Sequence, residues 1–266
     1  PEANERMLSK LESSPLLRGI ILSAISDHGS PKLLLSTIEH IRRMPEGRAR
    51  MHLIRSISFE RPESRDFLRD IAAGSGEEAA AALKGFAWHA PHEVRDIAHS
   101  AIHSDDYEMR VSAIEVLRGI NGTEEINTLA DLLKEPDINV RLKAIAALGR
   151  NHETHAKNVL INAFESFDSD LRLHTAYYVA ESNHPRSIDL LMEAALSGGD
   201  DAGAFYHAIE QIDSPEAQRA LKQIKKLSAG KGNDLQAAIL DSELKAKELA
   251  ELEAMLETLG PEPVRA

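Results

Sequence analysis

The sequence repeats with a period of 31 residues, and this repeat limits the fold more than any other feature. The segments 105–135, 136–166 and 167–197 align without a gap, and each carries an arginine in the same column. These arginines are Arg110, Arg141 and Arg172. A repeat of this length holds one small helical unit, which buries its apolar face only by stacking on its neighbours.

Extending the register in both directions divides residues 12–228 into seven units. Arg48 falls in the arginine column of the second unit, whereas Leu17, Ala79 and Gly203 occupy that column in the first, third and last units. The departures in the first and last units are typical of the capping repeats of an array. The predicted units are 12–42, 43–73, 74–104, 105–135, 136–166, 167–197 and 198–228.

Each unit is predicted to form two helices. In one unit Pro136 and Asp137 supply a cap and a first turn, and Val140, Ala144 and Leu148 follow at helical spacing. A break rich in glycine and asparagine separates this helix from a second apolar pattern. Aromatic residues make up only 4% of the chain, and no segment alternates with a period of two, so strands are not expected. The pattern predicts an all-α solenoid, a right-handed α-α superhelix.

The pattern D-x-x-V-R-x-x-A-x-x-A-L-G, which runs from Asp137 to Gly149, resembles HEAT repeats. More narrowly, it resembles the short bacterial HEAT-like repeats named after phycobilisome lyases. In similar repeats the arginine is structural, and we expect contacts between arginines and loop acids of successive units to hold the stack in register. The members of this predicted ladder are Arg110, Arg141, Arg172 and Asp137.

Residues 229–266 are predicted to form a linker and one further helix. The helical pattern spans 235–259 and ends at a Gly-Pro stop. Its leucines form one stripe, which is expected to fold onto the open end of the last unit. Self-association through 235–259 is the alternative. The stripe consists of Leu249, Leu252, Leu256 and Leu259.

Composition excludes several kinds of site and of partner. The chain has no cysteine, which rules out disulfides, thiolate metal sites and cysteine nucleophiles. No apolar run reaches the roughly 18 residues needed to span a bilayer. The net charge of −12 argues against general nucleic-acid binding. Residues 1–10 lack a signal pattern, so a cytoplasmic location is expected, or a periplasmic one if a signal has been removed.

No enzyme signature is present, since the chain has no P-loop, no dinucleotide-binding turn and no G-x-S-x-G motif. His99 and His103 are four residues apart, a spacing that can present two imidazoles to one metal, and they form a weak metal candidate. The His-Glu pairs at 92–93 and 152–153 are similar to the iron ligands of deoxyhypusine hydroxylase but occupy unequal repeat positions. We expect no catalytic residue, no cofactor and no metal.

Function is therefore expected on the second helices, which line the concave side of HEAT-like solenoids. Residues 1–73 hold 12 Lys+Arg and 10 Asp+Glu, a net of +2, against −14 for the remainder. Within that basic region, three arginines four residues apart form one stripe: Arg61, Arg65 and Arg69. Further along, the same columns hold a polar ladder with acidic ends: Asp96, Ser100, Asn127, Asp131, Asn158, Asn162, Asp189 and Glu193. The alternative is that both are simply solvated helix faces.

These surfaces predict a non-enzymatic scaffold or adaptor that binds another protein by shape and charge. HEAT-like alkylpurine glycosylases bind DNA on a basic, tryptophan-rich concave face, but here the second-helix columns are mostly acidic or neutral. The only tryptophan, Trp88, ends a first helix and is expected to pack in the core. The alternative function is a lyase-type or ligand-binding accessory protein with a pocket in the solenoid.

Overall fold

The protein folds into stacked pairs of helices. The computed structural model of the 266-residue chain describes residues 6, 9–11, 17–167, 169–197, 199, 201–228, 235–245 and 247–248. These residues contain helices and no strand, which confirms the all-α solenoid of two-helix units predicted from the repeat. No helix within them has the length and apolar character needed to cross a membrane. The chain divides into two compact units, 1–147 and 148–266.

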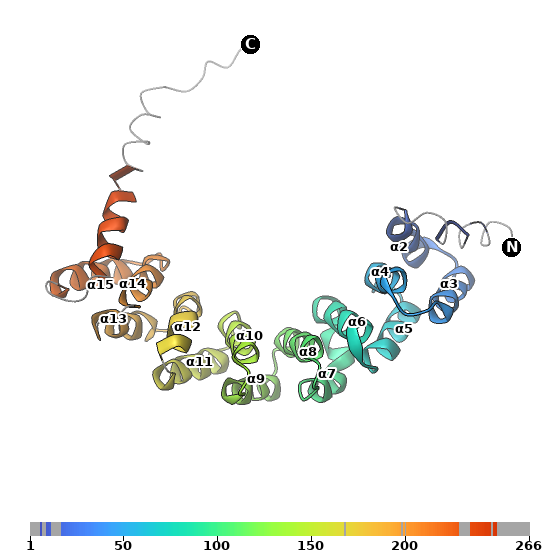
Figure 1. Ribbon diagram of the computed structural model, residues 1–266, viewed down its shortest axis with the longest axis horizontal. Coiled ribbons are helices and arrows are strands. Elements are labelled where there is room, and N and C mark those ends of the chain that lie inside the picture. Colours follow the sequence, from blue (N-terminus) through green and yellow to red (C-terminus); the bar gives the residue numbers. More distant parts are fainter. Residues whose placement is uncertain are drawn as a thin grey trace, which may run out of the picture. The chain divides into compact units, whose positions relative to one another are not determined.

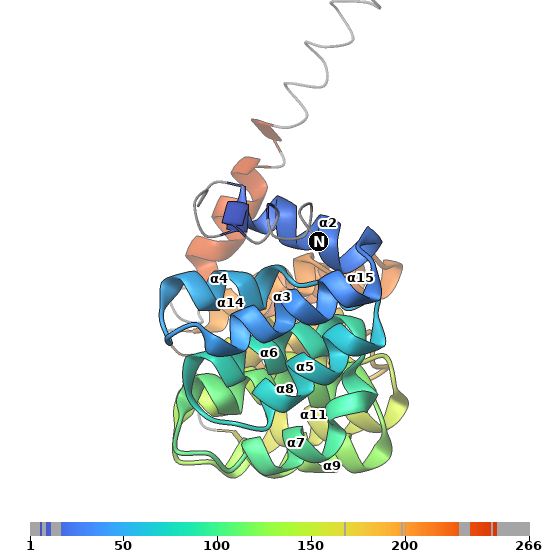
Figure 2. The ribbon, with the colours of Figure 1, turned by 90° about the vertical axis from the view of Figure 1, so that its right-hand side faces the viewer.

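The first unit contains successive helix pairs joined by short loops. In chain order its helices are α2 (Arg18–His28), α3 (Pro31–Arg43), α4 (Arg48–Ser56), α5 (Pro62–Ala72), α6 (Gly76–His89), the short η1 (Pro91–Val94), α7 (Arg95–Ala101), α8 (Tyr107–Ile120), α9 (Thr123–Asp131) and the short η2 (Leu132–Lys134). Each pair packs on the next, for example α5 on α6 and α7 on α8 (Figure 1 and Figure 2). Helix α10 (Ile138–Gly149) begins in this unit and ends in the second.

The second unit continues the same arrangement. Its helices are α11 (Thr154–Ser166), α12 (Ser169–Glu181), α13 (Ser187–Ser197), α14 (Ala202–Glu210), α15 (Pro215–Leu227) and a helical stretch at 235–245. Leu235, Ala238 and Ile239 of that stretch are buried. Glu243 forms an ion pair of 3.2 Å with Lys225 of α15. The stretch therefore packs on the end of this unit, whereas the predicted leucine stripe lies outside the described residues.

The helices start where the sequence offers caps. The side chain of Ser30 accepts a hydrogen bond of 3.2 Å from the backbone N–H of Leu33 at the start of α3. Asp106 accepts one of 2.8 Å from the N–H of Glu108 at the start of α8. Helix α8 ends at Asn121, whose φ of 60° lies in the left-handed region. These contacts satisfy backbone groups that a helix end leaves without an internal partner.

Small residues bring the first helices of the first unit close together. Helix α6 buries four alanines, and a Cβ atom added to Gly119 of α8 would lie 2.8 Å from the carbonyl oxygen of Ala87. The successive first helices α2, α4, α6 and α8 pack directly on one another. Within this unit they lie along the inner side of the curve, and α3, α5, α7 and α9 lie along its outer side (Figure 1). The expectation that second helices line the concave side is therefore wrong for the first unit.

Candidate functional site

The repeat arginines bind the loops that precede their own helices. Nη1 of Arg110 donates to the carbonyl oxygens of Ser104 at 2.8 Å and Asp105 at 3.3 Å, and its Nη2 lies 3.2 Å from Oδ2 of Asp137. In the same way, Nη1 of Arg141 donates to the carbonyl oxygens of Glu135 at 2.6 Å and Pro136 at 3.1 Å. Each guanidinium thus connects the loop before its helix to the first turn of that helix. Arg110 also contacts the following repeat.

Arg172 is the third arginine of this column. Its Nε is buried without a hydrogen-bond partner among the described residues. It lines a depression of about 300 Å³ together with Glu193 of α13. The two other repeat arginines bind loop carbonyl oxygens instead.

Arg65 of α5 has the same contacts as the repeat arginines, although it lies in a second helix. Its Nη1 donates to the carbonyl oxygens of Phe59 at 2.8 Å and Glu60 at 3.1 Å. Its Nε lies 2.9 Å from Oε1 of Glu93, which belongs to η1 of the next repeat. The side chain is only 26% exposed. Arg65 therefore joins a loop and two repeats, as Arg110 does.

The other two members of the predicted basic stripe are also held inside the first unit. Arg61 donates to the carbonyl oxygen of Gly29 at 2.8 Å, and Arg69 forms ion pairs with Asp66 and Glu93. The structure thus brings Arg65 and Arg69 together around one carboxylate. None of the three arginines presents a free guanidinium along α5.

Ion pairs between residues 28 positions apart connect successive repeats of the first unit. Arg42 lies 2.7 Å from Asp70, and Arg50 lies 3.3 Å from Glu78. Arg65 and Glu93 have the same separation in sequence. This regular spacing is the sequence signal that would have identified Arg65 as an internal contact.

His99, one of the two residues of the predicted metal candidate, contacts a buried carboxylate of the next repeat. Nε2 of His99 lies 3.3 Å from Oε1 of Glu125, which also binds Arg95 at 2.5 Å. Glu125 is 1% exposed. Burial alone raises the pKa of a carboxyl group, but hydrogen bonds from its backbone N–H, His99 and Arg95 hold the pKa of Glu125 below its usual value. His103 is exposed, and no group of three potential metal ligands occurs in the described ranges.

The residues of the predicted polar ladder are exposed, and they lie on second helices of the repeats in both compact units. In the first unit its members lie on α7 and α9, and in the second unit they lie on α11 and α13. Asp131 has a loose ion pair of 3.8 Å with Lys134, and Asn158 lies 3.1 Å from Nε2 of His184. All eight side chains are exposed: Asp96, Ser100, Asn127, Asp131, Asn158, Asn162, Asp189 and Glu193.

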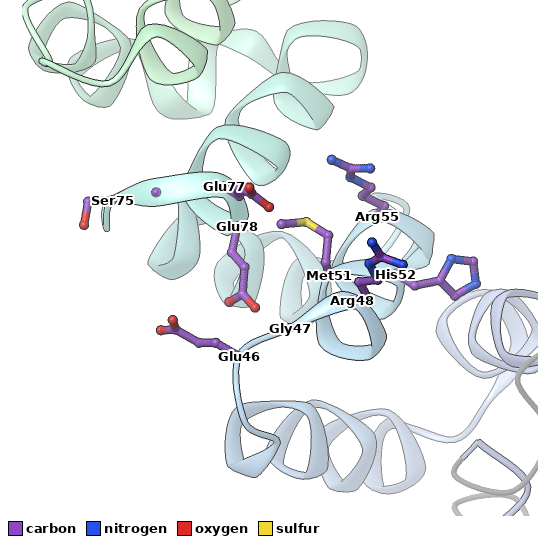
Figure 3. A pocket seen from close by; sticks show the side chains of 10 residues that line it. Glu46, Gly47, Arg48, Met51, His52, Arg55, Ser75, Glu77 and Glu78 are labelled. Carbon is purple, nitrogen blue, oxygen red and sulfur yellow. The ribbon is translucent and has the colours of Figure 1, made fainter.

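A hollow of the first unit follows the seam between α4 and α6. One depression of about 700 Å³ lies between α4 and the first turn of α6 (Figure 3). A second, of about 410 Å³, lies where α4 ends and α6 continues. Both are lined by Arg55, and together they form what we call the α4–α6 groove. The first is lined by Glu46, Gly47, Arg48, Met51, His52, Arg55, Ser75, Gly76, Glu77 and Glu78, and the second by Ile54, Arg55, Phe59, Leu68, Ala81, Ala82, Lys84, Gly85 and Trp88.

Cations follow the α4 side of this groove. Arg48, His52 and Arg55 have the spacing i, i+4, i+7 and so share one exposed face of α4. Lys84 of α6 is also exposed. Within the described part of the chain, no carboxylate forms an ion pair with Arg48, Arg55 or Lys84, whereas the neighbouring Arg50 is paired with Glu78.

The opposite end of the groove is apolar and aromatic. Trp88 is 69% exposed, so the prediction that it packs in the core is wrong. The guanidinium of Arg118 lies over its ring, 5.4 Å from the centroid. Phe59 stacks on His89 with a centroid distance of 4.6 Å, and it lies so close to Gly85 that an added Cβ would be 2.6 Å from the ring. The second depression therefore has a buried aliphatic floor, aromatic walls and two cations at its rim.

The acids of the groove are confined to its other end. Glu77 and Glu78 lie on the first turn of α6, and Glu46 precedes α4 (Figure 3). Sequence reasoning missed this site because it assigned Arg48 to the structural column and searched only the second helices. The spacing of Arg48, His52 and Arg55 was the signal that identifies it.

One comparison with known families bears on this chain. Residues 126–203 match the family model described as HEAT repeats. The matched stretch runs from α9 to the start of α14 and contains Arg141 and Arg172. No curated protein matches the chain significantly.

Proposed function

We propose that this HEAT-like repeat protein is a non-enzymatic scaffold or adaptor that binds another protein through the α4–α6 groove. HEAT repeats commonly serve as protein-interaction scaffolds. The observation that carries the proposal is a row of exposed cations, Arg48, Arg55 and Lys84, which have no ion-pair partner among the described residues and lie beside an exposed tryptophan. Aromatic and arginine side chains supply much of the binding energy in protein interfaces.

The contrast within α4 supports this reading. Arg50 is used inside the fold, because its side chain is only 18% exposed and pairs with Glu78. Arg48 and Arg55, on the groove side of the same helix, make no such pair among the described residues. Cations that the fold does not use are available to a carboxylate of a partner, and their field also speeds association.

The second helices offer a further contact surface. The exposed polar residues of the first unit, Asp96, Ser100, Asn127 and Asp131, suit a hydrogen-bonding or basic segment of a partner. We propose the same for Asn158, Asn162, Asp189 and Glu193 of the second unit. For Arg61, Arg65 and Arg69, the internal contacts favour a structural role over a partner-binding one.

One observation favours the alternative function, a ligand-binding accessory protein. The depression of about 700 Å³ between α4 and the first turn of α6 falls within the range of small-molecule sites. Its opposed acids and cations would suit a small zwitterion. A compound that copurifies with the protein and is displaced by Arg48→Glu would support this alternative.

The test is an affinity capture from a lysate, followed by mass spectrometry. The bait is the whole chain as wild type and as the double variant Arg48→Glu with Arg55→Glu. The control is Lys222→Glu with Lys226→Glu, which makes the same charge change at exposed positions of α15. We expect at least one protein to be retained by wild type and control and lost by the groove variant.

Far-UV circular dichroism must show that both variants are folded. Raising the salt concentration should release the same protein, because exposed charges are screened over about 8–10 Å at moderate ionic strength. Equal retention by wild type and the groove variant would contradict the proposal.

A further inference from the structure

The chemical character of the α4–α6 groove changes along its length. Acids stand at one end, where Glu46 precedes α4 and Glu77 begins α6. Arg48, His52 and Arg55 line the same depression as these acids, and the apolar depression beside Trp88, which Arg55 also lines, lies at the other end. The first turn of α6 lines the first depression and its later part, up to Trp88, lines the second, so α6 runs along the groove from the acids to the tryptophan. A bound chain therefore meets these features in a fixed sequence.

The spacing of the cations sets a scale for a bound chain. Arg48 and Arg55 are seven residues apart, and at about 1.5 Å per residue the helix places them roughly 10 Å apart. An extended chain advances about 3.3 Å per residue, so two of its residues about three positions apart span the same distance. In a polyproline II conformation, which has three residues per turn and a rise of about 3.1 Å per residue, side chains three positions apart face the same side, so both carboxylates can face α4.

We infer that the groove binds an extended peptide segment of a partner that carries two acidic residues about three positions apart, followed by an apolar residue. The acidic residues pair with Arg48 and Arg55. The apolar side chain enters the depression lined by Phe59 and Trp88, where Ile54 and Leu68 form a buried floor. This inference rests on the proposed function and specifies its partner.

Charge favours a peptide over a nucleic acid as the occupant. A continuous phosphate backbone would pass Glu46, Glu77 and Glu78 at one end of the groove. The whole chain carries a net charge of −12, which adds to that repulsion. A peptide places its charges only where the cations stand, and its apolar anchor uses the aromatic end.

The experiment uses the single tryptophan as a reporter. The probe is the fluorescein-labelled peptide Gly-Ser-Glu-Ser-Ser-Glu-Phe-Ser-Gly, titrated with the full chain at low ionic strength and followed by anisotropy. Emission of Trp88 is measured with the unlabelled peptide. Three further probes replace its Phe by Ser, replace both Glu by Lys, or are a ten-nucleotide oligo(dT). The protein variants are Arg55→Glu, Lys84→Glu and the control pair Lys222→Glu with Lys226→Glu.

We expect saturable binding of the acidic Phe peptide with a change in Trp88 emission. Removing the Phe anchor should weaken binding about tenfold or more, which corresponds to burial of one apolar side chain. Arg55→Glu and Lys84→Glu should each weaken it by a similar factor. The control pair should leave it unchanged. Two groove variants are included so that loss of folding in one does not end the test.

Three results would overturn the inference. The first is equal binding of the Phe and Ser peptides, and the second is binding of the Lys peptide or of oligo(dT) at least as tight as that of the acidic Phe peptide. The third is the absence of saturable binding by the acidic Phe peptide. In that last case, a lysate partner that still depends on Arg48 and Arg55 would leave the scaffold proposal standing and remove only this partner chemistry.

Discussion

Nε of Arg65 in α5 lies 2.9 Å from Oε1 of Glu93, which lies in η1 just before the second helix of the following repeat. Arg69 binds the other oxygen of the same carboxylate, so one acid holds two arginines of the preceding repeat. Arg65 also fixes the loop before its own helix through two carbonyl oxygens. A single side chain thus stabilises both a turn and the contact between neighbours.

Replacing Arg65 by Ala should lower the free energy of unfolding by about 1–3 kcal/mol, since it removes charge-assisted hydrogen bonds of a largely buried guanidinium. The matched control is Arg43→Ala, whose side chain is 77% exposed and pairs only within α3. The control should cost less than about 0.5 kcal/mol. Urea unfolding followed by circular dichroism measures both. Equal losses in the two variants would show that Arg65 is no more structural than a surface arginine.

Acid should weaken the fold through Glu125. Its pKa is lowered in the folded chain, because hydrogen bonds to the carboxylate outweigh the effect of burial. The stability that this carboxylate contributes is therefore fully present above the pKa of a glutamate in the unfolded chain and is lost as the pH falls through its folded-state pKa. Glu125→Gln should be less stable at pH 7 and should show a smaller further loss on acidification. Urea midpoints at pH 7 and below pH 4.5 test this, and an unchanged pH dependence in the variant would contradict it.

Gly119→Ala should destabilise the first unit by about 1–3 kcal/mol, because the new methyl group overpacks the seam between α6 and α8. Gly19→Ala is the matched control. Its Cβ would lie 3.4 Å from the flexible end of the His52 side chain, an ordinary contact. Since alanine favours a helix by about 1 kcal/mol over glycine, the control should be neutral or stabilising. Thermal unfolding of the two variants distinguishes the outcomes, and a similar shift in both would refute the close approach.

Trp88→Ala should separate binding from stability. Because the side chain is 69% exposed, its loss should change the free energy of unfolding by less than about 1 kcal/mol. Phe86→Ala, two residues earlier and fully buried, should cost about 3–5 kcal/mol. The Trp88 variant should nevertheless lose affinity for the partner captured through the groove. A large loss of stability in Trp88→Ala would contradict this prediction and would show that the side chain packs in the core.

The fold was predictable because the repeat restricts it locally. A column such as Val140, Ala144 and Leu148 requires a helix, and the 31-residue period requires each helix pair to meet its neighbour. Which arginines are accessible to a partner depends instead on contacts between residues about 28 positions apart. The identity of Arg65 gives no sign of the carboxylate opposite it, and so a stripe of arginines on one helix was interpreted as a free surface.

The exposure of Trp88 and the position of Arg48 in a groove could not be predicted from the sequence either. The first helices of the first unit lie on its inner side and approach closely at Gly119 and Ala87. Once the first helices form the closer layer, Trp88 at the end of α6 is exposed and Arg48 faces a groove. Periodicity alone treats both sides of the array as equivalent.

The 28-residue ion pairs also make the repeats of the first unit non-interchangeable. If residues 74–104 were deleted as one whole repeat, Met109 would take the place of Glu78 opposite Arg50, whereas Arg65 would still meet an acid, Glu124. A guanidinium that is only 18% exposed would then lack its carboxylate, a costly outcome for a buried charge. The pairs thus specify the order in which the repeats stand next to one another. They also oppose the slippage or exchange of whole repeats to which tandem arrays are prone.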